Sequence, residues 1–191
     1  MLTAKLILLY LLQSSQVTSL GIDPNTINAD EAMCMAQVVY YEARNEDIRG
    51  QYAVAHATLN RVNDPRFPKT VCAVVKQAKV TSTNQKIQCA FSWYCDSEAG
   101  NVPVRDKNGK PIQVNIEQFE VASLVAITAL AGETDDNTNG ATHFHNPYTS
   151  HPSWSKTLIK TVKIGNHAFY KMQPPKPVVK PEDESLMVAS Q

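Results

Sequence analysis

The stretch Asn115–Ala131 constrains the fold most strongly, because from Val121 onward it is apolar almost all round. A helix that is apolar on every side has to be buried by its neighbours. Asn115 and Gln118 match a capping pattern at its start, and Gly132 suits its end. The sequence therefore predicts a central buried helix with other elements packed around it.

More helices are predicted ahead of this one. Asn28 followed by Glu31 has the reciprocal capping pattern, which predicts a helix over residues 30–44. Apolar residues at helical spacing predict a second helix over residues 48–62. The break NDPRFP follows, and KTVCAVVKQ (69–77) predicts a short third helix.

The rest of the chain favours loops and hairpins. Residues 80–114 lack a helical period and contain Asn108-Gly109, so a loop with a small hairpin is expected. Residues 133–154 are a polar loop with two embedded histidines, and 157–171 form a terminal hairpin around Gly165-Asn166. The fold class is therefore α+β, mainly helical, in a single domain with small β-hairpins.

Both ends of the chain are expected to lie outside the domain. Residues 1–19 combine Lys5, an apolar run and small residues before Ser19, which indicates a signal or anchor segment. The alternative is an ordinary N-terminal helix of the domain. From Gln173 onward, prolines and a short acidic run predict a disordered tail over residues 173–191. The folded domain is expected over residues 22–172.

The charge balance excludes some partners. Lys plus Arg and Asp plus Glu number 18 each, so the formal net charge is zero. This indicates neither a nucleic-acid footprint nor a polybasic membrane patch. We expect a monomer that touches a membrane only through an uncleaved N-terminal segment. A sugar chain would suit such a protein.

The four cysteines can oxidise if the chain is exported. They allow three complete pairings, among which the sequence does not choose. Cys89 and Cys95 flank a short loop and could staple it, in which case Cys34 and Cys72 would tie two helices. Structural zinc is the rival interpretation, but the chain has no CxxC pair.

Glu42 lies in the apolar, aromatic stretch VVYYEARNED (38–47), where desolvating a carboxylate is costly. In a structural interpretation it pairs with Arg44, Arg49 or Arg61, or caps the following turn. In a functional one it lies in a cleft and stays protonated near neutral pH, which suits general-acid work. Spacing alone does not separate the two.

Other side chains are candidates for binding a substrate. Ser92, Trp93 and Tyr94 could offer a stacking surface, although packing beside the cysteines would explain them equally well. His143, His145 and Asn146 lie in a non-helical loop, where polar side chains are often functional. The spacing of the histidines could also suit a metal, with His151 or His167 as a third ligand. Trp154, Tyr41 and Glu46 complete the substrate-binding set.

Several motifs in order resemble one family. YYEARNEDIRGQYAVAHATLNRV (40–62) is similar to the signature of the SleB-type cell-wall hydrolases, the spore-cortex-lytic enzymes and their bacterial and phage relatives. RFPKTVCAVV, CAFSWYCD, GATHFHNP with PSW, and IGNHAFY follow in the family's order. The resemblance covers roughly residues 30–172. It implies a mainly helical domain related to lytic transglycosylases and goose-type lysozymes.

The resemblance also implies roles. The first glutamate of the family's E-A-R-G-E motif is the catalytic acid, which is Glu42 in this chain. The family usually has glycine where this chain has Asn45, and we expect a left-handed turn there, which Asn tolerates.

The chemistry needs a proton donor, and ordinary glycosidases add a second carboxylate. Glu46, Asp47, Asp96 and Glu98 are the candidates for it, and none is compelling. A lytic transglycosylase needs one carboxylate, which protonates the leaving oxygen and then deprotonates the muramoyl C6 hydroxyl.

The sequence therefore predicts an exported enzyme without a cofactor or metal, in the periplasm, cell envelope or outside the cell. It leaves open whether a host or a phage encodes the chain. Its partner would be peptidoglycan glycan strands, cut between MurNAc and GlcNAc to leave 1,6-anhydro-muramoyl products. The alternatives are a lysozyme-type hydrolase that uses water, a non-catalytic glycan-binding module of the same fold, and a zinc hydrolase centred on the histidine loop.

Overall fold

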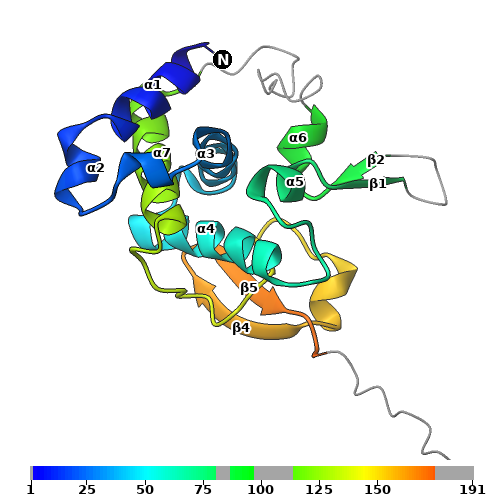
Figure 1. The fold of residues 1–191 in the computed structure, drawn as a ribbon. Helices are drawn as coiled ribbons and strands as arrows, with labels where there is room; N and C mark the ends of the chain where they lie inside the picture. Colours follow the sequence, from blue (N-terminus) through cyan, green and yellow to red (C-terminus); the bar gives the residue numbers. More distant parts are fainter. Residues whose placement is uncertain (1, 81–86, 97–113, 175–191) are drawn as a thin grey trace, which may run out of the picture.

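The computed structural model describes residues 2–80, 87–96 and 114–174 (Figure 1). The α-helices are α1 (Leu2–Leu12), α2 (Ser15–Ser19), α3 (Ala29–Ala43), α4 (Ile48–Asn63), α5 (Val71–Val75), α6 (Ser92–Asp96) and α7 (Ile116–Leu130), with short 3-10 helices at Pro24–Thr26 and Ser153–Lys156. The strands are β1 (Ala78–Val80), β2 (Ile87–Cys89), β3 (His143–His145), β4 (Ile159–Ile164) and β5 (His167–Lys171). The α+β, mainly helical fold class is thus confirmed.

Helix α3 lies at the centre of the helical part, where Figure 1 shows it end-on with α1 and α7 on one side and α5 on the other. Its inward residues Met35, Val38 and Val39 are fully buried. Helix α7 is buried where it packs against α1, α3 and α4, as expected. One side of α7 faces solvent, however, where Val121 is 42 % exposed, whereas α3 contacts α1, α4, α5 and α7, so α3 and not α7 is the central helix.

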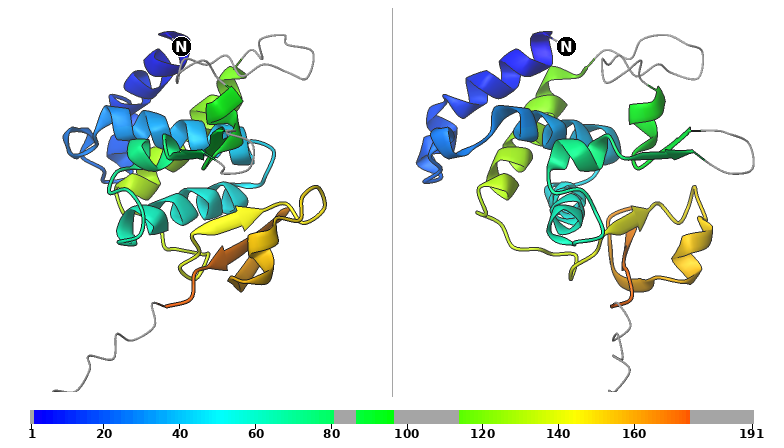
Figure 2. Two further views of the ribbon diagram at one scale, coloured as in Figure 1. Left: turned by 90° about the vertical axis from the view of Figure 1, so that its right-hand side faces the viewer. Right: turned by 45° about the vertical axis from the view of Figure 1, so that its right-hand side comes forward.

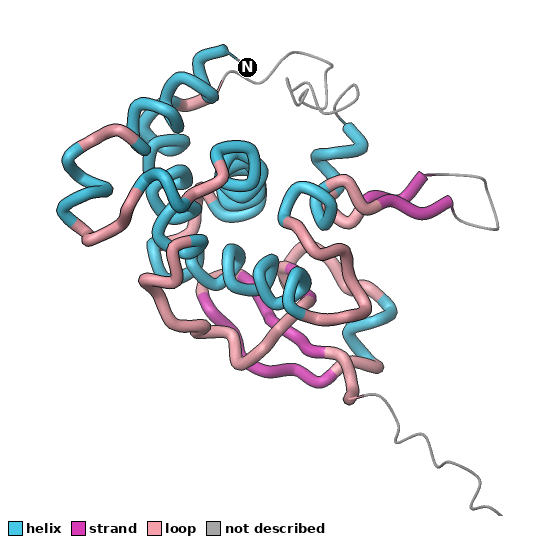
Figure 3. The backbone as a smooth tube through the Cα atoms, viewed as in Figure 1, coloured by secondary structure: helices cyan, strands magenta, loops and turns pink. Residues whose placement is uncertain are grey.

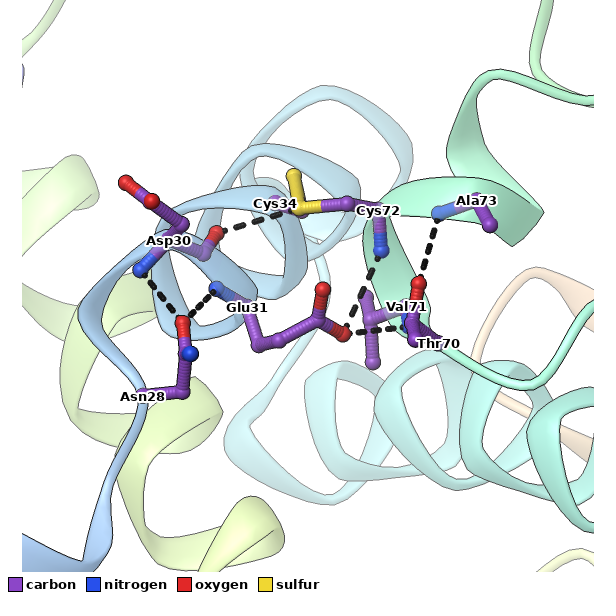
Figure 4. The surroundings of a disulfide bond; sticks show 8 residues. All are labelled: Asn28, Asp30, Glu31, Cys34, Thr70, Val71, Cys72 and Ala73. Carbon is purple, nitrogen blue, oxygen red and sulfur yellow. Dashed lines mark hydrogen bonds between the residues drawn. A yellow bond between two sulfur atoms is a disulfide. The ribbon is translucent and has the colours of Figure 1, made fainter.

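The predicted helix starts are confirmed by side-chain caps. Asn28 accepts hydrogen bonds from the backbone N–H groups of Asp30 and Glu31, and Asp47 and Asn115 cap α4 and α7 in the same way. The prediction that the Glu31 side chain bonds back to Asn28 is wrong. The Glu31 carboxylate reaches across to the N–H groups of Val71 and Cys72 at the start of α5, because free N–H groups there attract an anion (Figure 4).

The cysteines form two disulfides, Cys34–Cys72 and Cys89–Cys95. The first ties α3 to α5, directly beside the Glu31 contact (Figure 4). The second closes a short loop from β2 to α6. Both bonds therefore hold elements on the side of the molecule where α5 and α6 flank α3.

Strands occur in two places, as Figure 3 shows in magenta. The C-terminal sheet has the order β3-β5-β4 and is antiparallel, and it lies against α4 on the face opposite the other helices (Figure 2). The predicted terminal hairpin is confirmed, with Gly165 at positive φ in its turn. His143 and His145 lie on strand β3 and not in an irregular loop, since this segment pairs with β5.

The segment after α5 differs from its prediction. A small hairpin is present, but it is formed by β1 and β2, and α6 follows where only loop was expected. The expected turn at Asn108-Gly109 lies outside the described residues, as does most of the C-terminal tail.

The N-terminal segment forms α1, and its Leu8, Leu11 and Leu12 are buried against the rest of the core. This is the arrangement of a domain helix, the second of the two interpretations of the sequence; removal of residues 1–19 on export remains a prediction. None of the described helices has the length and hydropathy needed to cross a membrane.

Candidate active site

Glu42 lies in the last turn of α3, one residue before the helix ends at Ala43. It is partly buried, and the loss of solvent raises the pKa of its carboxyl to about 6. A carboxyl with this pKa holds a proton under mildly acidic conditions and can still release it near neutrality. This is the behaviour that general-acid catalysis requires.

The ion pairs that would explain Glu42 structurally are not formed. Among the described residues, no cation lies within 4 Å of its carboxylate oxygens. Arg44 instead lies over the Tyr40 ring, with 5.0 Å between its guanidinium carbon and the ring centroid. Arg61 is near enough to lower the pKa of Glu42, but burial outweighs this effect.

Arg61 is the cation of this site, and it comes from α4. Its Nε donates a hydrogen bond of 2.6 Å to the carbonyl oxygen of Thr142, just before β3. Its guanidinium lies 5.1 Å from the Phe91 ring centroid, and the residue is 8 % exposed. Burial lowers its pKa to about 10, so it remains charged at neutral pH.

Trp93 of α6 forms the other wall beside Glu42. Its ring stacks on Tyr41 with 4.9 Å between the ring centroids, and it is 6 % exposed. Its indole N–H favours the charged form of Glu42, although the described residues offer that N–H no acceptor in full hydrogen-bond geometry. Burial also raises the pKa of Tyr41 to about 12, so the phenol stays neutral. Trp93 thus helps to exclude water from the carboxyl.

A cavity of about 330 Å³ opens next to Arg61. Its walls come from α4, from the β1–β2 hairpin and from the start of the C-terminal sheet, through Arg61, Phe67, Gln77, Ala78, Lys79, Gln88, Cys89, Ala90, His143, Phe144 and Trp154. Arg61 therefore lines this cavity and also acts electrostatically on Glu42.

Two of the predicted binding residues, His143 and Trp154, line this cavity. Their rings are in contact, with 5.2 Å between the centroids. Burial lowers the pKa of His143 to about 4, with Arg61 and Arg66 adding to the effect, so the imidazole is neutral at pH 7. Its Nδ1 lies 2.9 Å from the Thr142 hydroxyl. A neutral imidazole and an indole form a surface suited to a polar organic ligand.

Glu46, four residues after Glu42, is engaged elsewhere. Its two carboxylate oxygens accept hydrogen bonds from the backbone N–H and the side-chain amide of Asn166, at 3.0 and 2.9 Å. One oxygen also lies 3.8 Å from His167 Nδ1. Glu46 thus holds the β4–β5 turn against the end of α3, and its predicted contact with substrate remains a prediction.

The remaining candidates are less closely grouped. His145 stacks on Tyr170, and its Nδ1 lies 2.9 Å from the Ser150 carbonyl oxygen. Asn146 accepts from the Tyr148 N–H and shapes the turn after β3. Ser92 is exposed at the start of α6. In the described part of the chain, no group of three or more His, Cys, Asp or Glu side chains is arranged to hold a metal ion.

Asn45 does not adopt the left-handed conformation that the resemblance suggested. Among the described non-glycine residues, only Asn139 has a positive φ. The chain leaves α3 through right-handed geometry at Arg44, so a side chain at position 45 causes no strain. The departure from the family's glycine is therefore neutral for the fold.

The site thus combines a desolvated carboxyl on the central helix, without an ion-pair partner among the described residues, and a buried arginine that lines a cavity. The chain belongs to the cell wall hydrolase family, whose model matches residues 45–170. The match begins just after Glu42 and includes Arg61, His143 and Trp154.

Curated relatives are spore cortex-lytic enzymes. One from Halalkalibacterium halodurans is 31 % identical over 146 residues, which is 76 % of this chain and 36 % of the relative. One from Bacillus cereus is 30 % identical over 148 residues, which is 78 % of this chain and 47 % of the relative. The chain thus spans less than half the length of these relatives.

Solved structures agree with the fold. The catalytic domain of the germination-specific lytic transglycosylase SleB from Bacillus anthracis matches with a TM-score of 0.55 and 28 % identity, covering 78 % of this chain and 99 % of that one. The catalytic domain of SleB from Bacillus cereus matches with a TM-score of 0.51 and 30 % identity, covering 75 % and 91 %. The region that this chain shares with its relatives therefore corresponds to a catalytic domain.

Proposed function

We propose that this protein cleaves the glycan strands of peptidoglycan between MurNAc and GlcNAc, as a lytic transglycosylase with Glu42 as its acid. The observation that carries the proposal is the Glu42 carboxyl, which is desolvated, has no ion-pair partner among the described residues and has a pKa of about 6. The similarity to SleB catalytic domains supports the substrate class.

The reaction needs one carboxyl group. Protonated Glu42 donates its proton to the glycosidic oxygen, the bond from that oxygen to the muramoyl C1 breaks, and GlcNAc leaves. The C1 centre is then oxocarbenium-like. The Glu42 carboxylate takes the proton of the muramoyl C6 hydroxyl as that oxygen attacks C1. A 1,6-anhydro ring forms, Glu42 is protonated again, and no water is consumed.

Groups around Glu42 would balance its protonated form, which the first half of the cycle needs, against its ionised form, which the second half needs. Burial of the Glu42 carboxyl favours the protonated acid that begins the reaction. Arg61 opposes burial and favours the carboxylate formed after proton transfer. A pKa of about 6 lies between these demands, as an acid that must later act as a base requires.

Mass spectrometry of the products from purified sacculi tests the proposal. We expect 1,6-anhydro-muropeptides, each lighter by one water than the product of a hydrolytic lysozyme. Glu42→Gln should release none, and Glu120→Gln is the control that should keep activity, because Glu120 is an exposed glutamate of α7 with no part in the proposed reaction. Reducing-end products would indicate a lysozyme-type hydrolase, and glycan binding without any cleavage would indicate a binding module.

We also propose that the protein is exported and acts in the cell envelope or outside the cell as a monomer. The two disulfides support export, because such bonds persist in oxidising compartments. N-terminal sequencing of the exported protein tests the leader: a chain starting at Leu20 is expected. A chain that retains residues 2–19 would assign α1 to the mature domain.

A further inference from the structure

The cavity beside Arg61 has a positively charged wall, which among the described residues is offset in part by Glu42, a carboxyl outside the lining that acts electrostatically on Arg61. Arg61 and Lys79 both line it, and none of its lining residues is an aspartate or glutamate. His143 contributes no charge at pH 7, because burial lowers its pKa to about 4. The nearby Asp64 is bound to Arg66 through an ion pair. The cavity is therefore a site for a ligand with negative charge.

Arg61 is buried at this site and held in a fixed position. The residue is 8 % exposed, and its guanidinium is fixed by the bond from Nε to the Thr142 carbonyl and by the Phe91 ring. Within the described part of the chain, its two terminal nitrogens donate no hydrogen bond, and no carboxylate lies within 4 Å of them. A buried guanidinium with unused donors is matched by a carboxylate, which accepts two parallel N–H bonds.

The proposed substrate offers carboxylates in one place. The sugar rings and acetamido groups of peptidoglycan are neutral, whereas the stem peptide on the lactyl group of MurNAc carries carboxylates. Arg61 lines the cavity and also acts electrostatically on Glu42, so the two lie close together, and a muramoyl residue at Glu42 would have its lactyl substituent within reach of the cavity.

Resting on the proposed function, we infer that this cavity binds a carboxylate of the MurNAc stem peptide, with Arg61 and Lys79 as the cations. Gln77 and Gln88 offer amides to the peptide backbone, and the faces of Phe67 and Trp154 contact its apolar part. The enzyme would then prefer glycan whose muramoyl residues carry stem peptides over glycan that lacks them.

Three forms of one uncross-linked glycan preparation test the inference: strands with native stems, strands with amidated stem carboxylates, and strands stripped of stems by an amidase and then amidated at the lactyl carboxylate that the amidase exposes. We expect kcat/KM to be at least about fivefold higher on the native form, the value of one charge pair at the water-exposed rim. Lys79→Met should lower kcat/KM about fivefold on native strands and leave it unchanged on the other two. Lys76→Met is the matched control, because Lys76 is an exposed lysine of the same region that does not line the cavity.

Each outcome decides the question. Equal rates of the wild type on all three forms, or an equal loss for Lys79→Met on all three, would overturn the inference; the second result would indicate a sugar subsite. The affinity of Glu42→Gln for the three forms separates this inference from the proposed function. Preferential binding of native strands by a protein that cuts none would retain the carboxylate site and reject the lytic activity.

Discussion

Replacing Glu42 with Gln should stabilise the protein more at pH 8 than at pH 4. In the folded protein the pKa of Glu42 is raised from 4.5 to about 6, so the folded state holds the proton more tightly than the unfolded chain does. At pH 4 both states are largely protonated and ionisation costs nothing. At pH 8 both are ionised, and the folded state bears the cost of a desolvated carboxylate.

The size of that cost follows from the pKa shift. A shift of one pKa unit corresponds to 1.36 kcal/mol, so the rise from 4.5 to about 6 amounts to about 2 kcal/mol. This penalty appears as the pH rises from about 4.5 through about 6. Gln has almost the same shape and no charge, so it avoids the penalty at every pH.

Urea denaturation of the wild type and Glu42→Gln at pH 4 and pH 8 measures this effect. The difference in unfolding free energy between the two proteins should be about 2 kcal/mol more favourable to the variant at pH 8 than at pH 4. Other titrating groups are common to both proteins and cancel in this difference. A pH-independent difference would show that folding does not shift the pKa of Glu42, and a variant that loses stability at pH 8 relative to pH 4 would show a paired structural carboxylate; either result would refute the reasoning.

Further expectations concern the walls of the site and the ends of the chain. Arg61→Met removes the charge that lowers the Glu42 pKa, so the alkaline limb of the pH–rate profile should move to higher pH. Replacing both cysteines of Cys34–Cys72 by Ser should cost about 4 kcal/mol of stability, and those of Cys89–Cys95 about 2 kcal/mol, from loops of 38 and 6 residues. The second pair should reduce activity more, because it anchors the helix that carries Trp93. Truncation after Met172 should preserve activity and cost at most about 1 kcal/mol, since it removes one exposed hydrogen bond from Arg66 to the Gln173 carbonyl.

A different result would contradict each of these expectations. An alkaline limb that stays in place or moves down in Arg61→Met would mean that Arg61 does not act on Glu42. Reactive thiols in the denatured, unreduced protein would contradict both disulfides. Loss of activity in a folded truncated protein would give the tail a role in catalysis.

Much of the local structure is predictable from the sequence. The helix starts at Asn28, Asp47 and Asn115 depend on a side chain that bonds to a backbone N–H two or three residues later. The Gly165-Asn166 turn depends on a glycine that adopts positive φ. These interactions are formed within a few neighbouring residues, so the amino-acid sequence alone is enough to predict them. The same holds for recognition of Glu42 as a carboxylate in an apolar helix.

Other features depend on residues that are far apart in the chain. Glu31 has a good local partner in its own cap, but the free N–H groups of Val71 and Cys72, forty residues away, compete for its carboxylate. α7 is the more apolar helix by sequence, yet α3 is central, because packing depends on which faces meet.

The same distinction applies to the site. The sequence by itself determined that a carboxyl would stand in an apolar helix and that histidines and a tryptophan would lie near one another late in the chain. Only the tertiary structure decided that Glu42 has no ion-pair partner among the described residues, that Arg61 bonds to the Thr142 carbonyl instead, and that Glu46 holds a turn. Protonation depends on the solvent and charges around a group in three dimensions, and those surroundings are brought together only when distant segments pack.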